Sequence, residues 1–261
     1  LKEVWHYRDL LQMFVKRDFI TFYKQTILGP LWFIVQPLLT TLIYVILFGN
    51  IAKLSTDGIP QVLFYLSGIT IWNYFSESLT KTSTVFKDNA NMFGKVYFPR
   101  LIMPLAIVSS SLMKFLVQFG IFIVVLLYYV IFTDTIKPNI WILFTPFLIF
   151  LMAIFALGMG MIFSSLTTKY KDLVFLLSFG IQLFMYVTPV VYPLSSLPEN
   201  FRFLGVINPL SPLFECFRYA YLGTGSFNIE SLVISTIIII LILIVGTVIF
   251  NRVEKTFMDT V

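Results

Sequence analysis

The chain has 261 residues, of which 58% are hydrophobic and only 12% charged, with a mean hydropathy of +0.91. A soluble domain carries about 25% charged residues, so this composition excludes a soluble globular protein and indicates an integral membrane protein. The formal net charge of +5 does not indicate a nucleic-acid-binding protein, because the cations lie in short loops beside apolar runs.

Residues 1–24 are predicted to form an amphipathic helix. Its apolar residues recur at spacings of three and four and occupy one face: Val4, Tyr7, Leu11, Phe14, Val15 and Phe22. Lysine and arginine decorate the rest of the helix, although Asp18 interrupts the apolar face. A basic helix with an aromatic face is typical of a segment that lies in the plane of the lipid headgroups.

Six apolar segments follow that are long enough to cross a bilayer. They cover residues 31–50, 60–80, 105–132, 140–163, 173–192 and 229–250. About twenty helical residues, each rising ~1.5 Å, span the ~30 Å hydrocarbon core. The sequence therefore predicts an all-α integral membrane protein with one transmembrane domain over residues 1–261.

The third and fourth of these segments have features of their own. The third exceeds one bilayer thickness, so we expect Pro104 and Ser109–Ser111 to break it near the inner interface. We expect the ammonium group of Lys114 to extend to the inner headgroups, and a role inside the channel is the alternative. In the fourth, small residues repeat every four positions: Ala156, Gly160 and Ser164. Such a ridge predicts the close approach of another helix.

Residues 193–228 combine frequent proline and glycine with many aromatic side chains. Two short helices are expected, near 201–207 and 211–221, and neither is long enough to span a bilayer. Irregular backbone is tolerated at membrane depth only where protein or a cavity surrounds it. We therefore predict a re-entrant helical hairpin on the outer, periplasmic face.

The distribution of lysine and arginine predicts the orientation of the spans. With both termini in the cytoplasm, 13 of the 18 cations lie on the inner side: Lys2, Arg8, Lys16, Arg17, Lys24, Lys81, Lys87, Lys95, Arg100, Lys169, Lys171, Arg252 and Lys255. Four lie on the outer side: Lys53, Lys137, Arg202 and Arg218. Cytoplasmic loops are enriched in these residues, so both termini are expected inside.

No catalytic or metal-ligating pattern occurs in the sequence. His6 is the only histidine and Cys216 the only cysteine, so neither a metal cluster nor an intrachain disulfide is expected. Ionisable residues within the spans are few and peripheral: Glu77 and Lys114 near the inner side and Glu230 near the outer. Proton- or sodium-coupled transport usually needs carboxylates near the midplane, so the energy is expected to come from elsewhere.

A polar loop over residues 86–100 separates the second and third spans. It ends in Lys95-Val96-Tyr97-Phe98-Pro99-Arg100, and Pro104 follows. This run resembles the signature loop of the membrane subunits of ABC-type polysaccharide exporters. Further similarities occur in order at Gly29-Pro30-Leu31-Trp32, Tyr170-Lys171-Asp172, Asn208-Pro209-Leu210, Phe217-Arg218 and Glu254-Lys255-Thr256-Phe257. Lys171 departs from the expected arginine and loses its bidentate geometry.

The resemblance implies a multi-pass permease subunit of the bacterial inner membrane. Such subunits form homodimers, join two ATP-binding subunits, and export undecaprenyl-diphosphate-linked polysaccharide such as O-antigen, capsule or teichoic acid. ATP and Mg²⁺ are then bound by the partner subunit, so this chain is expected to be no enzyme and to hold no cofactor.

The resemblance also implies roles for individual residues. Those expected to couple the chain to the ATPase are Met92, Phe93, Lys95, Val96, Pro99 and Arg100. Those expected to form a periplasmic gate are Pro193, Asn208, Pro209 and Arg218.

The first and fifth spans, which line the channel in this family, each carry a stripe of rings and uncharged polar groups. The stripes are Phe33, Gln36, Thr40 and Tyr44, and Phe175, Phe179, Gln182 and Tyr186. Helix packing alone produces such stripes in a phenylalanine-rich chain, but an amide that faced lipid would be costly. We therefore expect both stripes to line a polysaccharide channel at the dimer interface, where rings contact sugar faces.

Two alternatives stay open from the sequence. An ABC exporter of drugs or small lipids would have the same fold. A membrane-embedded glycosyltransferase would require an acidic pair or a metal-ligating motif in a loop, and the sequence contains neither.

Overall fold

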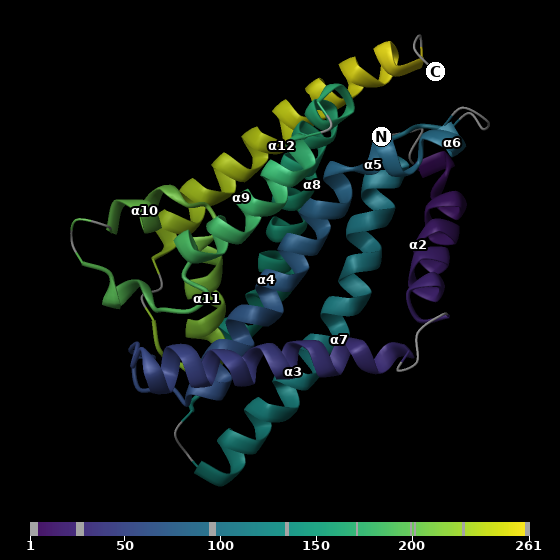
Figure 1. Cartoon of the computed structure of the whole chain (residues 1–261). Coiled ribbons are helices and arrows are strands. Elements are labelled where there is room, and N and C mark those ends of the chain that lie inside the picture. Colours follow the sequence, from purple (N-terminus) through teal and green to yellow (C-terminus); the bar gives the residue numbers. More distant parts are fainter. Residues whose placement is uncertain are drawn as a thin grey trace.

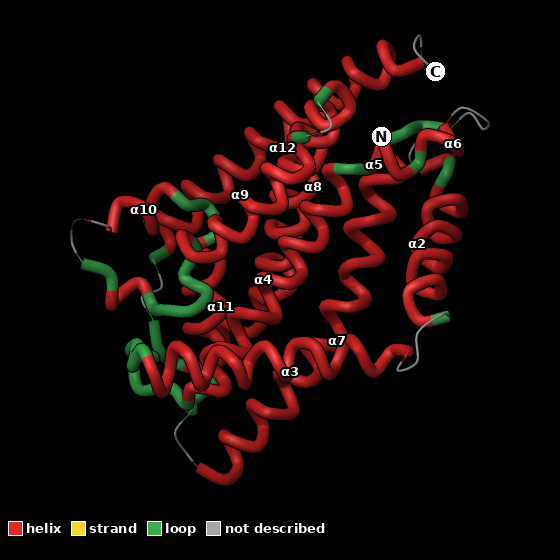
Figure 2. The backbone as a smooth tube through the Cα atoms, in the orientation of Figure 1, coloured by secondary structure: helices red, strands yellow, loops and turns green. Residues whose placement is uncertain are grey.

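The computed structural model describes residues 5–24, 29–93, 98–133, 136–170, 172–198, 200, 202–225 and 228–258. All regular structure within these residues is helical, and they contain no strand (Figure 2). The predicted all-α class is therefore confirmed for the described part of the chain.

The helices follow one another along the chain with short connections. The first half contains α2 (Arg8–Tyr23), the short helix η1 (Gly29–Leu31), α3 (Trp32–Tyr44), the π-helical continuation η2 (Val45–Ile51), α4 (Gln61–Ser83), α5 (Val85–Asp88), α6 (Ala90–Phe93) and α7 (Ile102–Thr133). The second half contains η3 (Ile140–Phe144), α8 (Thr145–Lys169), α9 (Leu173–Val187), η4 (Leu194–Ser196), α10 (Arg202–Ile207), α11 (Ser211–Leu222) and α12 (Ile229–Met258).

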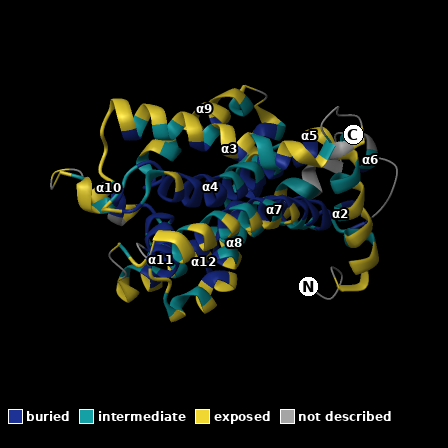
Figure 3. Ribbon diagram, turned by 90° about the horizontal axis from the view of Figure 1, so that it is seen from below, coloured by how far each residue is buried: buried dark blue, intermediate teal, exposed yellow. Residues whose placement is uncertain are grey.

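Helix α4 lies at the centre of the molecule. It contacts α3, α7, α8 and α9, and it is the most uniformly buried helix in Figure 3. Its hydroxyl-bearing residues are buried as well, among them Ser67, Thr70, Ser78 and Thr82. This helix is therefore surrounded by protein, which explains how it can carry so many polar residues.

Four segments of the described chain are long and apolar enough to cross a membrane. They are Gly29–Ile51, Ile102–Thr133, Ile140–Lys169 and Ile229–Glu254. Helix α9, Leu173–Val187, is apolar but shorter. The length and composition of these four segments indicate a multi-pass membrane protein. Helices α4 and α9 do not meet the same criterion of length and hydropathy.

Close packing of α8 depends on glycine, as the small-residue ridge predicts. A Cβ atom on Gly160 would lie 2.5 Å from the Cβ of Thr82 in α4, so the two helices touch there. On another face of α8, a Cβ atom on Gly246 of α12 would lie 2.4 Å from the carbonyl oxygen of Gly158. The predicted close approach is confirmed at Gly160. Helix α8 also approaches α12 closely, through Gly158, which is not part of the predicted ridge.

Two helices differ from the predicted segments, while the bounds of the membrane spans stay predictions. Helix α7 runs without a break from Ile102 to Thr133, because Pro104 lies in its first turn, where no backbone hydrogen bond is lost. Helix α9 ends at Val187, five residues before the expected end, because Pro189 disfavours helical geometry at Thr188. Thr188 is accordingly extended, with φ −87° and ψ 142°.

The remaining expectations concern the two ends of the chain and residues 193–228. The two short helices expected there are present as α10 and α11. Their re-entrant position in a membrane stays a prediction, as does the interfacial position of α2. Phe14 of α2 is buried and packs against Phe98, with ring centroids 5.7 Å apart, so part of the apolar face of α2 contacts protein.

The segments predicted to be cytoplasmic gather at one end of the molecule. Helices α2, α5 and α6, the connection from α8 to α9 and the last turns of α12 lie together there (Figure 1). Helix α10 and the connection from η2 to α4 lie at the opposite end. The fold therefore separates the predicted inner and outer segments.

Candidate functional site

A polar cavity of about 640 Å³ lies between α3, α4, α7 and α9. Its lining residues are Trp32, Phe33, Gln36, Tyr44, Trp72, Asn73, Ser76, Glu77, Thr80, Lys81, Lys114, Gln118, Ser178, Ile181, Gln182 and Met185. The lining thus combines aromatic rings, four carboxamide groups and three charged groups. Such a surface can contact a polar, uncharged polymer and can also hold an anion.

The charged groups in this cavity form one cluster. The ammonium group of Lys81, one turn after Glu77 on α4, lies 2.6 Å from Oε1 of Glu77. Lys114 of α7 donates a hydrogen bond to the same carboxylate oxygen. Two cations therefore share one oxygen of a single carboxylate, across the interface between α4 and α7.

Lys114 does not extend to the headgroups, so that prediction was wrong. The residue is only 7% exposed and its ammonium group lies 5.3 Å from the centroid of the Phe33 ring. A carboxylate partner and an aromatic face are both within reach inside the protein, and together they stabilise the charge there.

The sequence does contain a signal for this cluster. Asn73, Glu77 and Lys81 follow at spacings of four on α4, and Lys114 and Gln118 do so on α7. The side-chain amide of Asn73 donates to the carbonyl oxygen of Gln118 at 3.2 Å, so the two polar stripes face each other. Each stripe is short and lies within an apolar span, so the sequence pattern alone does not indicate a charged cluster there.

Four of the eight residues predicted to line a channel meet in this cavity. They are Phe33, Gln36 and Tyr44 of α3 and Gln182 of α9. The glutamines therefore approach one cavity from two helices that are far apart in sequence. The phenol of Tyr44 also donates to the sulfur of Met185 at 3.4 Å, which links the C-terminal ends of α3 and α9.

The other four residues lie elsewhere on these two helices. Thr40 is half-buried and donates to the backbone carbonyl of Gln36 at 2.9 Å. Phe175, Phe179 and Tyr186 are 80%, 58% and 47% exposed on α9. They do not line the cavity within this chain, so their position in a channel stays a prediction.

The segment expected to couple the chain to an ATPase is anchored by a cluster of rings. Phe93 of α6 is only 4% exposed and lies 5.9 Å from Phe86 and 5.7 Å from Phe98, measured between ring centroids. Phe86 in turn stacks on Phe250 of α12 at 4.6 Å. Phe93 is thus part of the internal packing of the chain, whereas Met92 is half-buried.

Arg100 closes this cluster from the loop before α7. Its guanidinium carbon lies 5.1 Å from the centroid of Phe93, and it donates to the carbonyl oxygen of Glu254 at 3.3 Å. Burial lowers the pKa of Arg100, and the carboxylate of Glu254 opposes that shift. Pro99 is half-buried beside it, while Lys95 and Val96 lie outside the described residues.

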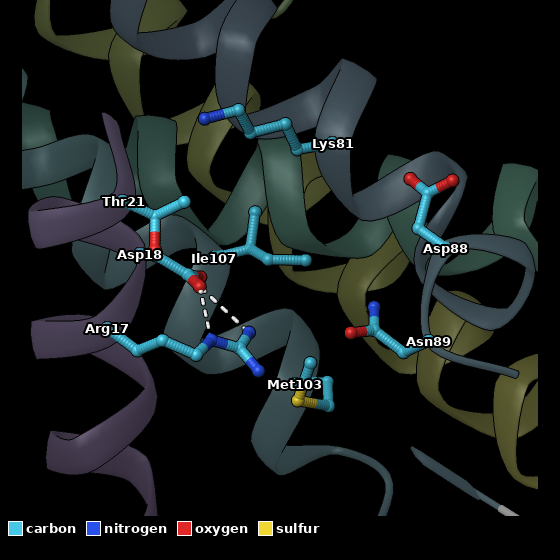
Figure 4. Close-up of a pocket in the computed structure, with 8 residues that line it drawn as sticks. All are labelled: Arg17, Asp18, Thr21, Lys81, Asp88, Asn89, Met103 and Ile107. Atoms are coloured by element: carbon cyan, nitrogen blue, oxygen red, sulfur yellow. Dashed lines mark hydrogen bonds and ion pairs between the residues drawn. The ribbon is translucent and has the colours of Figure 1, made fainter. Parts of the chain in front are cut away.

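A second pocket, of about 680 Å³, lies between α2, α4, the α5 region and α7. Figure 4 shows Arg17 and Asp18 of α2, paired at 2.8 Å, on one side and Asp88 and Asn89 on the other. Lys81 lines this pocket as well as the polar cavity. Lys81 therefore lies between two spaces. One is the pocket beside α2 and α5, and the other is the polar cavity inside the helix bundle.

Arg218 of α11 joins the outer end of α9 to the bundle. Its guanidinium group donates to the carbonyl oxygens of Pro189 and Val190, both at 2.7 Å. The guanidinium carbon also lies 3.8 Å from the centroid of Phe64 in α4. These contacts satisfy carbonyl groups of the non-helical segment that follows α9.

The other residues expected at a periplasmic gate lie in the same region. The side-chain amide of Asn208 donates to the hydroxyl of Thr188 at 2.8 Å, and its carbonyl oxygen accepts from the backbone of Leu210 at 2.9 Å. Pro193 precedes η4, and Pro209 follows Asn208. Asn208 and Arg218 are thus brought together around residues 188–190, although a gating role stays a prediction.

Polar residues that line a cavity between membrane helices are typical of a substrate path. Residues 9–222 match the ABC-2 type transporter family, and the chain belongs to that family. The chain is therefore the membrane part of an ABC transporter, as its resemblance to exporter subunits predicted.

Curated relatives cover nearly the whole chain. An O-antigen export system permease protein RfbA of Klebsiella pneumoniae is 31% identical over 252 residues, which are 96% of this chain and 94% of the relative. A protein of the same name from Myxococcus xanthus is 25% identical over 100% of this chain and 98% of its own length. The capsule polysaccharide export inner-membrane protein CtrC of Neisseria meningitidis serogroup A is 22% identical over 92% of this chain and 89% of its own length.

Proposed function

We propose that this chain is the transmembrane subunit of an ATP-driven exporter that moves lipid-linked polysaccharide across the bacterial inner membrane. Two copies would form a homodimer and bind two ATP-binding subunits, which would hold ATP and Mg²⁺. Membership of the ABC-2 family and the export functions named for the relatives support this proposal.

The polar cavity is the observation that favours a sugar polymer. Gln36, Gln182 and Asn73 offer uncharged donors and acceptors, which can exchange hydrogen bonds with sugar hydroxyls as a chain advances. Trp32 and Trp72 supply flat apolar surfaces that suit the faces of sugar rings. A path for an apolar drug would not require this many carboxamide groups.

The channel would form where the cavity of one copy faces that of the other. Gln36 and Gln182 are exposed within the single chain although they lie in apolar helices. An exposed amide in hydrocarbon is costly, so these faces are better placed against water or a second copy than against lipid. The exposed rings of Phe175, Phe179 and Tyr186 on α9 are available to the same interface.

Six spans are consistent with this arrangement. Helix α4 carries polar residues, but they are buried against neighbouring helices and need not face lipid. Helix α9 has 15 residues and covers only about 22 Å at 1.5 Å per residue, so residues 188–192 would complete its passage. Both termini and the segment at residues 85–100 would then lie in the cytoplasm, where that segment can contact the ATP-binding subunit.

An export assay in cells tests this function. In a bacterium whose own copy of this gene has been deleted, the chain should restore surface polysaccharide only together with its ATP-binding partner. Replacing both cavity amides, by Gln36→Leu and Gln182→Leu, should reduce export several-fold while the subunits still co-purify.

The control is Val124→Ala, an exposed apolar residue of α7 that neither lines the cavity nor belongs to α3 or α9. Its export should stay near the wild-type level. Full export by the double glutamine variant would refute the channel assignment, and failure of the wild-type chain to restore any polysaccharide would refute the function.

A further inference from the structure

We propose that Lys81, Glu77 and Lys114 form an anion-binding site within the polar cavity, which takes the diphosphate group of a lipid-linked substrate. This inference rests on the proposed function and specifies where the charged part of the substrate is held. The site is formed by α4 and α7, separately from the amides of α3 and α9.

The charge balance of the cavity is the first argument. Glu77, Lys81 and Lys114 are the charged residues among those that line it, which gives a formal excess of one positive charge. Both ammonium groups contact one oxygen of Glu77, so a single carboxylate neutralises two cations only in part. Lys114, whose side chain is only 9% exposed, attracts an anion more strongly than a fully hydrated ammonium group would.

The carboxylate of Glu77 explains how such a site can exist when it is empty. The Lys114 side chain is only 9% exposed and would be destabilised without a counter-ion, and Glu77 provides that counter-ion within the fold. A diphosphate carries several oxygens that accept charge-assisted hydrogen bonds, so it can replace part of this internal contact. Glu77 therefore competes with the ligand for Lys81 and Lys114.

Uncharged donors surround the cluster. The amides of Asn73 and Gln118 lie on the same two helices, and the hydroxyl-bearing residues Ser76 and Thr80 line the cavity beside Glu77. The hydroxyls of Ser76 and Thr80 donate to backbone carbonyl oxygens, whereas the amide of Gln118 can donate to phosphate oxygens that the lysines do not reach. The adjacent glutamines of α3 and α9 leave room in the same cavity for the first sugar.

The position of Lys81 connects the site to the inner end of the molecule. Lys81 also lines the second pocket, where Arg17 of α2 and Asn89 lie (Figure 4). That pocket is also lined by Asp88 and by Asp18, which pairs with Arg17 at 2.8 Å, so Lys81 is the cation that the pocket shares with the polar cavity. Lys81 can therefore contact an anion from either side, from this pocket or from the cavity.

A purely structural ion pair is the competing explanation. The two explanations predict opposite changes in anion affinity when Glu77 is neutralised. If the cluster only stabilises the fold, neutralising either partner should weaken the protein and any ligand binding together. If it is an anion site, removing Glu77 should strengthen anion binding, whereas removing a lysine should weaken it. Whether anion affinity rises or falls when Glu77 is neutralised therefore decides between the two explanations.

The experiment measures binding to the purified full chain in lipid nanodiscs. Farnesyl diphosphate, inorganic pyrophosphate and farnesol serve as probes, and the fluorescence of Trp32 and Trp72, which line the cavity, reports occupancy. Glu77→Gln should lower the Kd of farnesyl diphosphate several-fold, and Lys114→Gln should raise it about tenfold or more. Lys114→Arg should bind nearly as the wild type does, and Lys169→Gln, an exposed lysine at the end of α8, is the control.

The three probes separate the possible sources of the anion. Binding of farnesyl diphosphate and of pyrophosphate, both sensitive to Lys114→Gln, would show that the site recognises the diphosphate itself. Binding of farnesyl diphosphate alone, with the same sensitivity, would show that the lipid is also required. Equal binding of farnesol, or weaker binding by Glu77→Gln, would overturn the proposal.

This test is independent of the export assay. If the wild-type chain restores polysaccharide export but the charge variants bind farnesyl diphosphate equally, only the anion site is wrong. If the variants show the expected opposite shifts but the wild-type chain exports no polysaccharide, the proposed function is wrong and the site stands.

Discussion

At the scale of single residues, burial separates side chains that the sequence had grouped together. Met92 and Phe93 are neighbours in the segment predicted to contact an ATPase, yet Phe93 packs among Phe86, Phe98 and Arg100 inside the chain. Met92 is only half-buried. A partner subunit can therefore contact Met92 directly, whereas Phe93 holds the segment in shape.

Alanine substitutions should distinguish these two roles. Phe93→Ala removes a buried ring and should lower stability by about 3–5 kcal/mol, measured as loss of folded protein during heating in detergent. Met92→Ala should leave stability nearly unchanged and reduce co-purification of the ATP-binding subunit. Met13→Ala, at an exposed position of α2, is the control. Undiminished co-purification with Met92→Ala would show that this side chain lies outside the coupling interface.

At the scale of helices, the packing of α8 depends on the absence of side chains at its contacts. Gly160 faces Thr82 of α4, and Gly158 faces Gly246 of α12. Both contacts bring backbones close enough that a Cβ atom would overlap the neighbouring helix. Helix α8 therefore connects the buried α4 to the apolar α12, and this close approach stabilises the bundle through dispersion contacts.

A bulky residue at Gly160 should separate α4 from α8. Gly160→Leu should destabilise the protein by about 1–3 kcal/mol or more, because the added atoms have no space beside Thr82. Gly120→Leu in α7 is the matched control, since no atom beyond its own helix lies within 4 Å of a Cβ atom built there. The measurement is the midpoint of thermal unfolding in the same detergent. Equal midpoints for the two variants would contradict the packing argument.

At the scale of the whole molecule, the fold places segments from distant parts of the sequence at the same end. Helices α2, α5 and α6 and the last turns of α12 lie together, and they carry several of the cations assigned to the inner side, among them Arg8, Arg17, Lys87 and Arg252. The positive-inside rule then predicts which end faces the cytoplasm. This orientation also places the second pocket and Arg17 at the inner surface.

Labelling of single cysteines in intact cells should establish the orientation. With the buried Cys216 replaced by serine, Asp57→Cys and Lys137→Cys should react with a membrane-impermeant thiol reagent. Asp88→Cys and Lys169→Cys should react only after the cells are opened. Reaction of Lys169→Cys in intact cells would contradict the six-span topology.

The sequence by itself determined the class of the protein and most of its helices. Long apolar runs can be satisfied only in a bilayer, and helices are the simplest way to pair their backbone groups there. The motifs around Lys95 and Asn208 likewise indicated the exporter family before any contact was known. The helical face that carries Phe33, Gln36 and Tyr44 was also readable, because side chains three and four residues apart share one face.

Only the tertiary structure decided what those faces meet. Periodicity identifies a face of a helix but not its neighbour, so Gln36 and Gln182 could be joined in one cavity only when α3 and α9 were placed. Lys114 was assigned to the headgroups because its partner, Glu77, is 37 residues away in the sequence. The stability of a charge inside a membrane protein depends on its partners in space, and those partners are fixed by the packing of α4 against α7.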